Sequence, residues 1–128
     1  MTNIDRNYVG IALIWLVLGM LLGLAVGISA DHTFLNLHIV MVLSGFVVLT
    51  LYGAIYRLWP ALKQGPLAKI QFWAAMLGQL GIAIGTFLFD IDGEVNVLAG
   101  SSILSIAGAG LLAWLFWSRG GAAASPLP

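Results

Sequence analysis

Residues 34–58 read FLNLHIVMVLSGFVVLTLYGAIYRL, and this stretch decides the fold. His38 is the only acidic or basic side chain in it before Arg57, which lies near its end. A helix needs about 20 apolar residues to cross the hydrocarbon core of a bilayer. The stretch therefore predicts a transmembrane helix that carries one histidine about one turn after its start.

Three further segments have the same length and character. The four predicted spans are Tyr8–Ala30, Phe34–Leu58, Leu67–Phe89 and Val95–Ser118. Only 8% of the 128 residues are charged, against about a quarter in a soluble domain. We therefore expect an all-α, polytopic membrane protein that lies in the lipid bilayer, with one four-helix transmembrane domain over residues 1–118. Residues 119–128 are rich in small residues and proline, and we expect them to form a flexible tail.

The charged residues predict the orientation of the chain. All lysines and arginines fall on one side of the predicted membrane: Arg6, Arg57, Lys63, Lys69 and Arg119. Four acids fall on the other side: Asp31, Asp90, Asp92 and Glu94. Short connections make consecutive helices antiparallel neighbours, and the positive-inside rule places both termini in the cytoplasm. We expect the cytoplasmic membrane of a bacterium or an archaeon.

Composition and motifs exclude several classes of function. The chain has no cysteine, which excludes disulfides, cysteine-ligated zinc, iron–sulfur clusters and covalently attached c-type haem. A formal net charge of +0 argues against a nucleic-acid partner. The sequence holds no phosphate-binding loop, catalytic triad or HExxH motif, and it identifies no catalytic residue. No acid lies inside a span, which weighs against a small multidrug exporter.

His38 is the strongest candidate for a functional residue, because ionisable groups in hydrocarbon are costly and rare. Met41 and Gly45 share its face of the helix. Met41 offers a soft apolar wall, and Gly45 leaves room for a flat macrocycle or for another helix. This surface suits a b-type haem with His38 as the iron ligand. The structural alternative is that His38 bonds a neighbouring carbonyl or serine and holds the bundle together.

His32 offers two further alternatives in the outer loop. Together with Asp31 and the acids of the other outer loop, it could bind a divalent cation. It could also be a second haem ligand. On one continuous helix, its six-residue offset from His38 would point the two rings to different faces, so this second role requires a non-helical loop.

Two features of the spans predict contacts between helices. Gln79 lies in the middle of the third span, where an unpaired amide costs several kcal/mol, and we expect an interhelical hydrogen bond. Gly19, Gly23 and Gly27 recur at four-residue spacing in the first span. Such small residues let two helix backbones approach closely.

Two stretches resemble a known family. The first runs from His38-Ile39-Val40-Met41 through Ser44-Gly45-Phe46 to LYGAIYRLWP at residues 51–60, and the second is KIQFW at residues 69–73 followed by Gly78. They are similar to the second and third helices of subunit I of haem–copper oxidases and nitric oxide reductases. The resemblance covers the whole chain as the first four helices of a twelve-helix subunit.

By this resemblance His38 corresponds to the ligand of the low-spin haem. The family's second axial histidine, and its ligands for copper and the high-spin haem, belong to helices that this chain lacks, so we do not expect oxygen reduction by this chain alone. A second copy could supply the other axial histidine in a homo-oligomer. A five-coordinate haem could instead bind a gas.

The sequence thus predicts an integral membrane protein that binds haem b and serves in electron transfer or in haem or gas binding, with an unidentified redox partner. The alternatives are a cofactor-free structural or accessory membrane protein and a small transporter.

Overall fold

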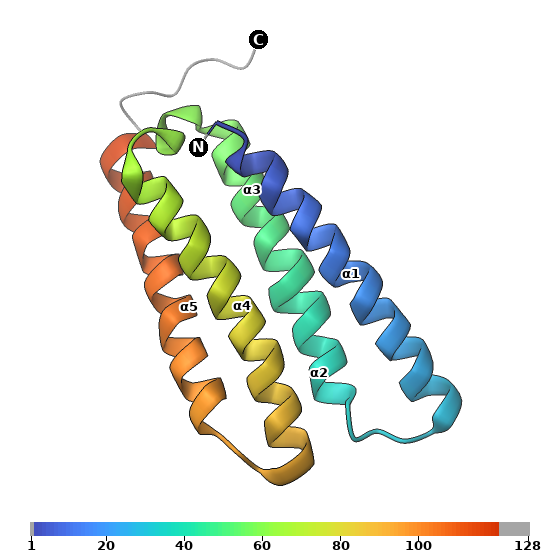
Figure 1. The fold of residues 1–128 in the computed structure, drawn as a ribbon. Coiled ribbons are helices and arrows are strands. Elements are labelled where there is room, and N and C mark those ends of the chain that lie inside the picture. Colours follow the sequence, from blue (N-terminus) through green and yellow to red (C-terminus); the bar gives the residue numbers. More distant parts are fainter. Residues whose placement is uncertain (1, 121–128) are drawn as a thin grey trace.

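The computed structural model describes residues 2–120, and this part of the chain is helical and has no strand. Figure 1 shows the helices side by side as one elongated bundle. Four of them are long and apolar enough to cross a membrane: Ile4–Ser29, Leu35–Leu58, Pro66–Asp92 and Asn96–Gly120. The predicted all-helical class is confirmed for these residues, as is the prediction of four helices long and apolar enough to cross a membrane.

The observed helices are longer than the predicted spans at several ends. The first helix, α1 (Ile4–Ser29), begins one turn before the predicted start. The third, α4 (Pro66–Asp92), continues past the predicted end at Phe89. The last helix runs to Gly120, so residues 119 and 120 are helical rather than part of the predicted tail. Residues 121–128 of that tail lie outside the described residues.

The second span changes its helical geometry in the middle. It begins as α2 (Leu35–Val40), continues as the π-helix η1 (Met41–Val48) and ends as α3 (Leu49–Leu58). π-Helices are rare, and short ones inside α-helices are frequent at functional sites. His38 lies just before this π-helix.

The first two spans form one closely packed pair. Helix α1 packs along η1 and α3. The close approach depends on glycine: a methyl group at Gly19 would lie 2.9 Å from Val42, and one at Gly53 would lie 2.9 Å from Val9. Gly27, the last member of the predicted glycine ridge, has nothing within 4 Å of such a methyl group. The ridge therefore serves packing over only part of its length.

The last two spans form a second pair. Helix α4 packs along α5 (Asn96–Leu115) over most of its length, and the π-helix η3 (Phe116–Gly120) completes this last span. Gly78 and Gly81 of α4 lie against Ser105 and Ser101 of α5. The first pair touches α4 mainly through α2. The bundle is therefore two helix pairs that meet along a narrower seam.

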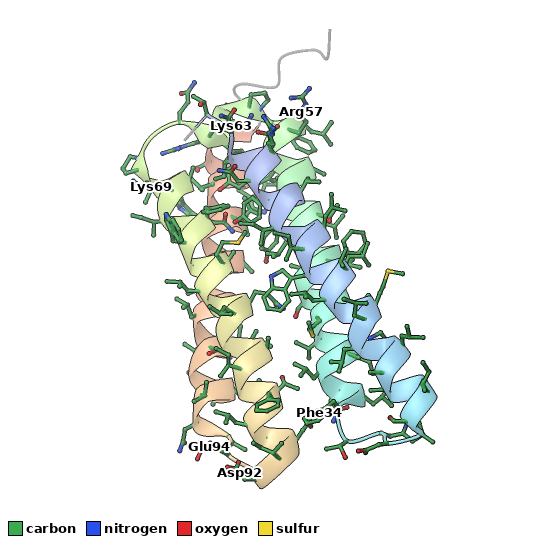
Figure 2. All side chains as sticks on the ribbon, turned by 45° about the vertical axis from the view of Figure 1, so that its right-hand side comes forward. Phe34, Arg57, Lys63, Lys69, Asp92 and Glu94 are labelled. Carbon is green, nitrogen blue, oxygen red and sulfur yellow. The ribbon has the colours of Figure 1, made fainter. Side chains whose placement is uncertain are left out.

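Most charged side chains lie at opposite ends of the bundle according to their sign, and the acid Asp5 is an exception. Arg57, Lys63 and Lys69 lie at one end, which we name the basic end, and Asp92 and Glu94 lie at the other, the acidic end (Figure 2). The short helix η2 (Pro60–Lys63) connects α3 toward α4 at the basic end. There Lys63 Nζ lies 2.9 Å from one carboxylate oxygen of Asp5, and the Arg57 guanidinium lies 3.5 Å from the other.

Candidate functional site

His38 lies on α2 with its imidazole against α1. Its Nδ1 atom lies 2.7 Å from the carbonyl oxygen of Gly19. A carbonyl oxygen can only accept, so Nδ1 carries the proton and the lone pair of the neutral ring is on Nε2. The ring packs over Gly23, where a methyl group would lie 2.6 Å from Cε1. Helix α1 therefore fixes both the tautomer and the orientation of His38.

The second ring nitrogen of His38 is free of such contacts. Within residues 2–120, Nε2 makes no hydrogen bond, and it is not fully buried. The residue as a whole is half-buried. The structure thus presents one oriented ring nitrogen that makes no hydrogen bond within the described residues.

Met41 and Gly45 share a face of the helix with His38, and like His38 they contact α1. Met41 is buried, and a methyl group at Gly19 would lie 3.3 Å from its Cβ. At Gly45 a methyl group would lie 2.8 Å from the indole of Trp15. The space that Gly45 opens is therefore filled by a tryptophan from α1, and it is not the open wall expected for a macrocycle.

His32 lies in an exposed, non-helical loop, as its possible role as a second ligand requires. Its neighbour Asp31 accepts hydrogen bonds from the Thr33 hydroxyl at 2.6 Å and the Thr33 amide at 3.0 Å. These bonds hold the pKa of Asp31 below its ordinary value. Over the described part of the chain, no three histidine or acidic side chains gather closely enough to hold a metal ion. The structure therefore does not gather His32 and the outer acids into a metal-binding group of this kind.

A buried network at the basic end joins all four spans, and the sequence alone does not reveal it. Tyr8 of α1 and Tyr56 of α3 both donate to Oε1 of Gln71, at 2.5 and 3.0 Å. Gln71 Nε2 donates to the carbonyl oxygen of Gly108 on α5 at 3.2 Å. The three side chains are 0% exposed. A glutamine early in an apolar span was the only sequence signal, and it names none of its partners.

Gln79 has a different environment about two turns further along α4. Its side chain is 3% exposed, and its Nε2 atom is buried and has no hydrogen-bond partner within residues 2–120. The interhelical hydrogen bond expected for this amide group is therefore not formed by the described side chains. A partly enclosed cavity of about 60 Å³ lies beside it. Its lining comes from all spans except α1: Ser44, Val48, Leu49, Tyr52, Ala75, Gln79, Ile82 and Ser105.

No family model, curated protein or solved structure matches this chain.

Proposed function

We propose that this membrane protein binds a b-type haem through Nε2 of His38, for electron transfer or for haem or gas binding. The observation that carries the proposal is the 2.7 Å contact between Nδ1 and the Gly19 carbonyl oxygen. Metal-ligating histidines almost always donate their other ring N–H to a carboxylate, a backbone carbonyl or water. His38 has this arrangement inside an apolar span, and its Nε2 faces no protein partner within the described residues.

The donor set favours haem over a bare metal ion. No group of three potential ligands exists among residues 2–120, and His38 offers a single nitrogen. A porphyrin brings its own four nitrogen donors, so its iron needs only one or two axial ligands from protein. When bound, the haem supplies a one-electron iron couple, and His38 supplies an axial ligand whose orientation α1 maintains.

The proposal extends to the assembly and orientation of the chain. We propose an antiparallel four-helix bundle with both termini in the cytoplasm of a bacterium or archaeon, as a minimal relative of oxidase subunit I. A homo-oligomer in which a second copy contributes its own His38 would complete bis-histidine ligation, which suits electron transfer because it leaves no open site on the iron. Closed cyclic symmetry, most often a dimer, is the common form of such oligomers.

The absorption spectrum tests the proposal. Protein produced with ample haem is expected to show a Soret band, and His38→Ala is expected to abolish it. His32→Ala is the matched control, because it removes the other histidine of the chain from an exposed loop, and it should keep the band. Colourless wild-type protein, or a band of undiminished intensity in His38→Ala, would contradict the assignment.

The same contact also supports a second function, that of a cofactor-free structural or accessory membrane protein. In that case the bond from His38 to Gly19 serves only to join α2 to α1. Interhelical hydrogen bonds in membranes contribute about 0.6 kcal/mol on average. His38→Ala would then lower the free energy of unfolding by about this amount and change no spectrum.

A further inference from the structure

A groove lies between α1 and α4 toward the basic end of the bundle. Helices α1 and α4 touch each other only sparingly, which leaves this space between them. The groove has a volume of about 450 Å³, within the range of about 300–1,000 Å³ that is typical of ligand sites. Its lining comes from both helices: Arg6, Asn7, Gly10, Ile11, Phe72 and Trp73.

The apolar walls of the groove are held in place by the protein, which does not fill the space between them. Phe72 is 3% exposed and packs edge-on against Tyr8 of α1, with ring centroids 4.9 Å apart. Trp73 packs against the Phe72 ring at 5.5 Å and stays 48% exposed. A methyl group at Gly10 would have nothing within 4 Å, unlike one at Gly53. The missing side chain of Gly10 therefore serves no helix contact, and it leaves room for a ligand.

Two basic side chains without an acidic partner lie at one end of the groove. Arg6 is exposed and lines the groove directly. Lys69 lies one turn before the aromatic wall on the same face of α4, at the basic end (Figure 2). Within residues 2–120 neither forms an ion pair, whereas Lys63 and Arg57 share Asp5. The groove thus carries uncompensated positive charge at its end.

This combination of charge at one end and apolar walls along the length fits one class of ligand, a phospholipid. Its headgroup would lie at the basic end and an acyl chain along the walls. A negative headgroup complements Arg6 and Lys69, and the side-chain amide of Asn7 can donate to a phosphate oxygen. Basic pockets between transmembrane helices are a common setting for anionic headgroups.

We infer that this groove binds one anionic phospholipid. Its phosphate contacts Arg6 and Lys69, and one acyl chain lies against Gly10, Ile11 and Trp73. The inference requires only that the helices lie in a membrane, which supplies the lipid. It does not use the histidine that we propose as the haem ligand, so it is independent of the proposed function.

Native mass spectrometry of the full-length protein tests the site. Protein in detergent is titrated with phosphatidylglycerol or with phosphatidylcholine of the same acyl chains, and the spectra report both bound lipid and oligomeric state. The wild-type protein is expected to bind one phosphatidylglycerol per chain saturably. Phosphatidylcholine should bind several-fold more weakly, because its headgroup carries no net charge.

Removal of the basic side chains tests the headgroup contacts. Arg6→Gln and Lys69→Gln should each weaken phosphatidylglycerol binding about fivefold and leave phosphatidylcholine binding nearly unchanged. Arg57→Gln is the matched control, because Arg57 lies at the same end, approaches Asp5 and does not line the groove. Its affinity for phosphatidylglycerol should change far less.

Filling of the groove tests the acyl-chain contacts. Gly10→Leu places a branched side chain in the groove and should weaken binding of phosphatidylglycerol at least several-fold. Gly27→Leu is its control, because Gly27 also has open space around it on α1 but does not line the groove. Neither glycine supports a helix contact, so circular dichroism should show both variants folded.

Four results would overturn the inference. The first is equal binding of the two lipids by the wild-type protein, which would indicate only non-specific surface lipid. The second is a loss in Arg57→Gln as large as that in Arg6→Gln, and the third is unchanged lipid binding in Gly10→Leu. The fourth is a wild-type dimer that dissociates in Gly10→Leu, which would assign the groove to a second copy of the chain.

Discussion

Two glutamines about two turns apart on α4 are both buried but differ in their hydrogen bonding. Gln71 and Gln79 are 0% and 3% exposed, so burial does not distinguish them. Gln71 has partners on every other span. Gln79 lies beside Gly45 of η1, next to which Trp15 of α1 is packed, and the indole of a tryptophan can donate but not accept. A buried amide is thus satisfied only where the neighbouring helices bring complementary groups.

The comparison has a structural consequence for the bundle as a whole. The hydrogen bonds of Gln71 tie the basic end of the two pairs together, whereas the region around Gln79 is a hollow seam. We therefore expect mutations near Gln71 to act on stability. Mutations near Gln79 should cost less stability, because its Nε2 has no hydrogen bond to lose within the described residues.

The largest effect is expected when the satisfied glutamine is removed. Gln71→Leu deletes three hydrogen bonds and leaves the hydroxyls of Tyr8 and Tyr56 without their acceptor. We expect the free energy of unfolding to fall by about 3 kcal/mol. Each hydrogen bond in a membrane contributes up to about 1.7 kcal/mol, and the tyrosine hydroxyls left without an acceptor add a further cost. Gln79→Leu is the control and should cost less than half as much. Equal losses in a denaturant titration would break the comparison.

A somewhat smaller effect is expected at Gly45, which separates Gln79 from Trp15. In Gly45→Ala the new methyl group would lie 2.8 Å from the indole and 3.1 Å from Gln79 Nε2. Overpacking of this kind costs about 1–3 kcal/mol, and thermal unfolding should register it. Gly27→Ala is matched in chemistry but has open space around it. A lower melting temperature in Gly27→Ala than in Gly45→Ala would show that this contact is not what matters.

The smallest effect is expected when one donor to Gln71 is removed. Tyr8→Phe or Tyr56→Phe leaves the other hydroxyl on the same amide oxygen, so each change should lower the free energy of unfolding by about 1 kcal/mol. The double variant should lose more than the sum of the two, because Oε1 then has no donor. Tyr52→Phe is the control, since Tyr52 takes no part in this network. Strict additivity of Tyr8→Phe and Tyr56→Phe would show that the two bonds act independently.

Hydropathy predicts the helices well because each apolar segment has to become helical in hydrocarbon whatever the other segments do. A segment such as residues 34–58 must satisfy its own backbone hydrogen bonds in hydrocarbon, and a helix does this without any other part of the chain. The ends were less well predicted. The first predicted span starts at Tyr8, whereas helix α1 begins at Ile4 and carries Asp5, paired with Lys63, in its first turn.

The candidate site could be predicted only as far as individual residues. An imidazole in an apolar span is unusual, so the sequence singles out His38 and also allows a bond from it to a neighbouring carbonyl. The register between α1 and α2 decides which carbonyl oxygen meets the imidazole, and therefore which ring nitrogen makes no hydrogen bond. In the structure the Gly19 carbonyl oxygen lies at Nδ1. The space at Gly45 was expected for a macrocycle or another helix, and Trp15 of α1 fills it.

The sequence by itself determined four helices that are long and apolar enough to cross a membrane, and a separation of the lysines and arginines from four of the five acids. These properties follow from the transfer of each segment from water to hydrocarbon, which depends on local composition alone. Only the tertiary structure decided that Gln71 is satisfied and Gln79 is not, and that η1 interrupts the second span beside a cavity. Hydrogen bonds and close packing between helices depend on which faces meet, and no single span contains that information.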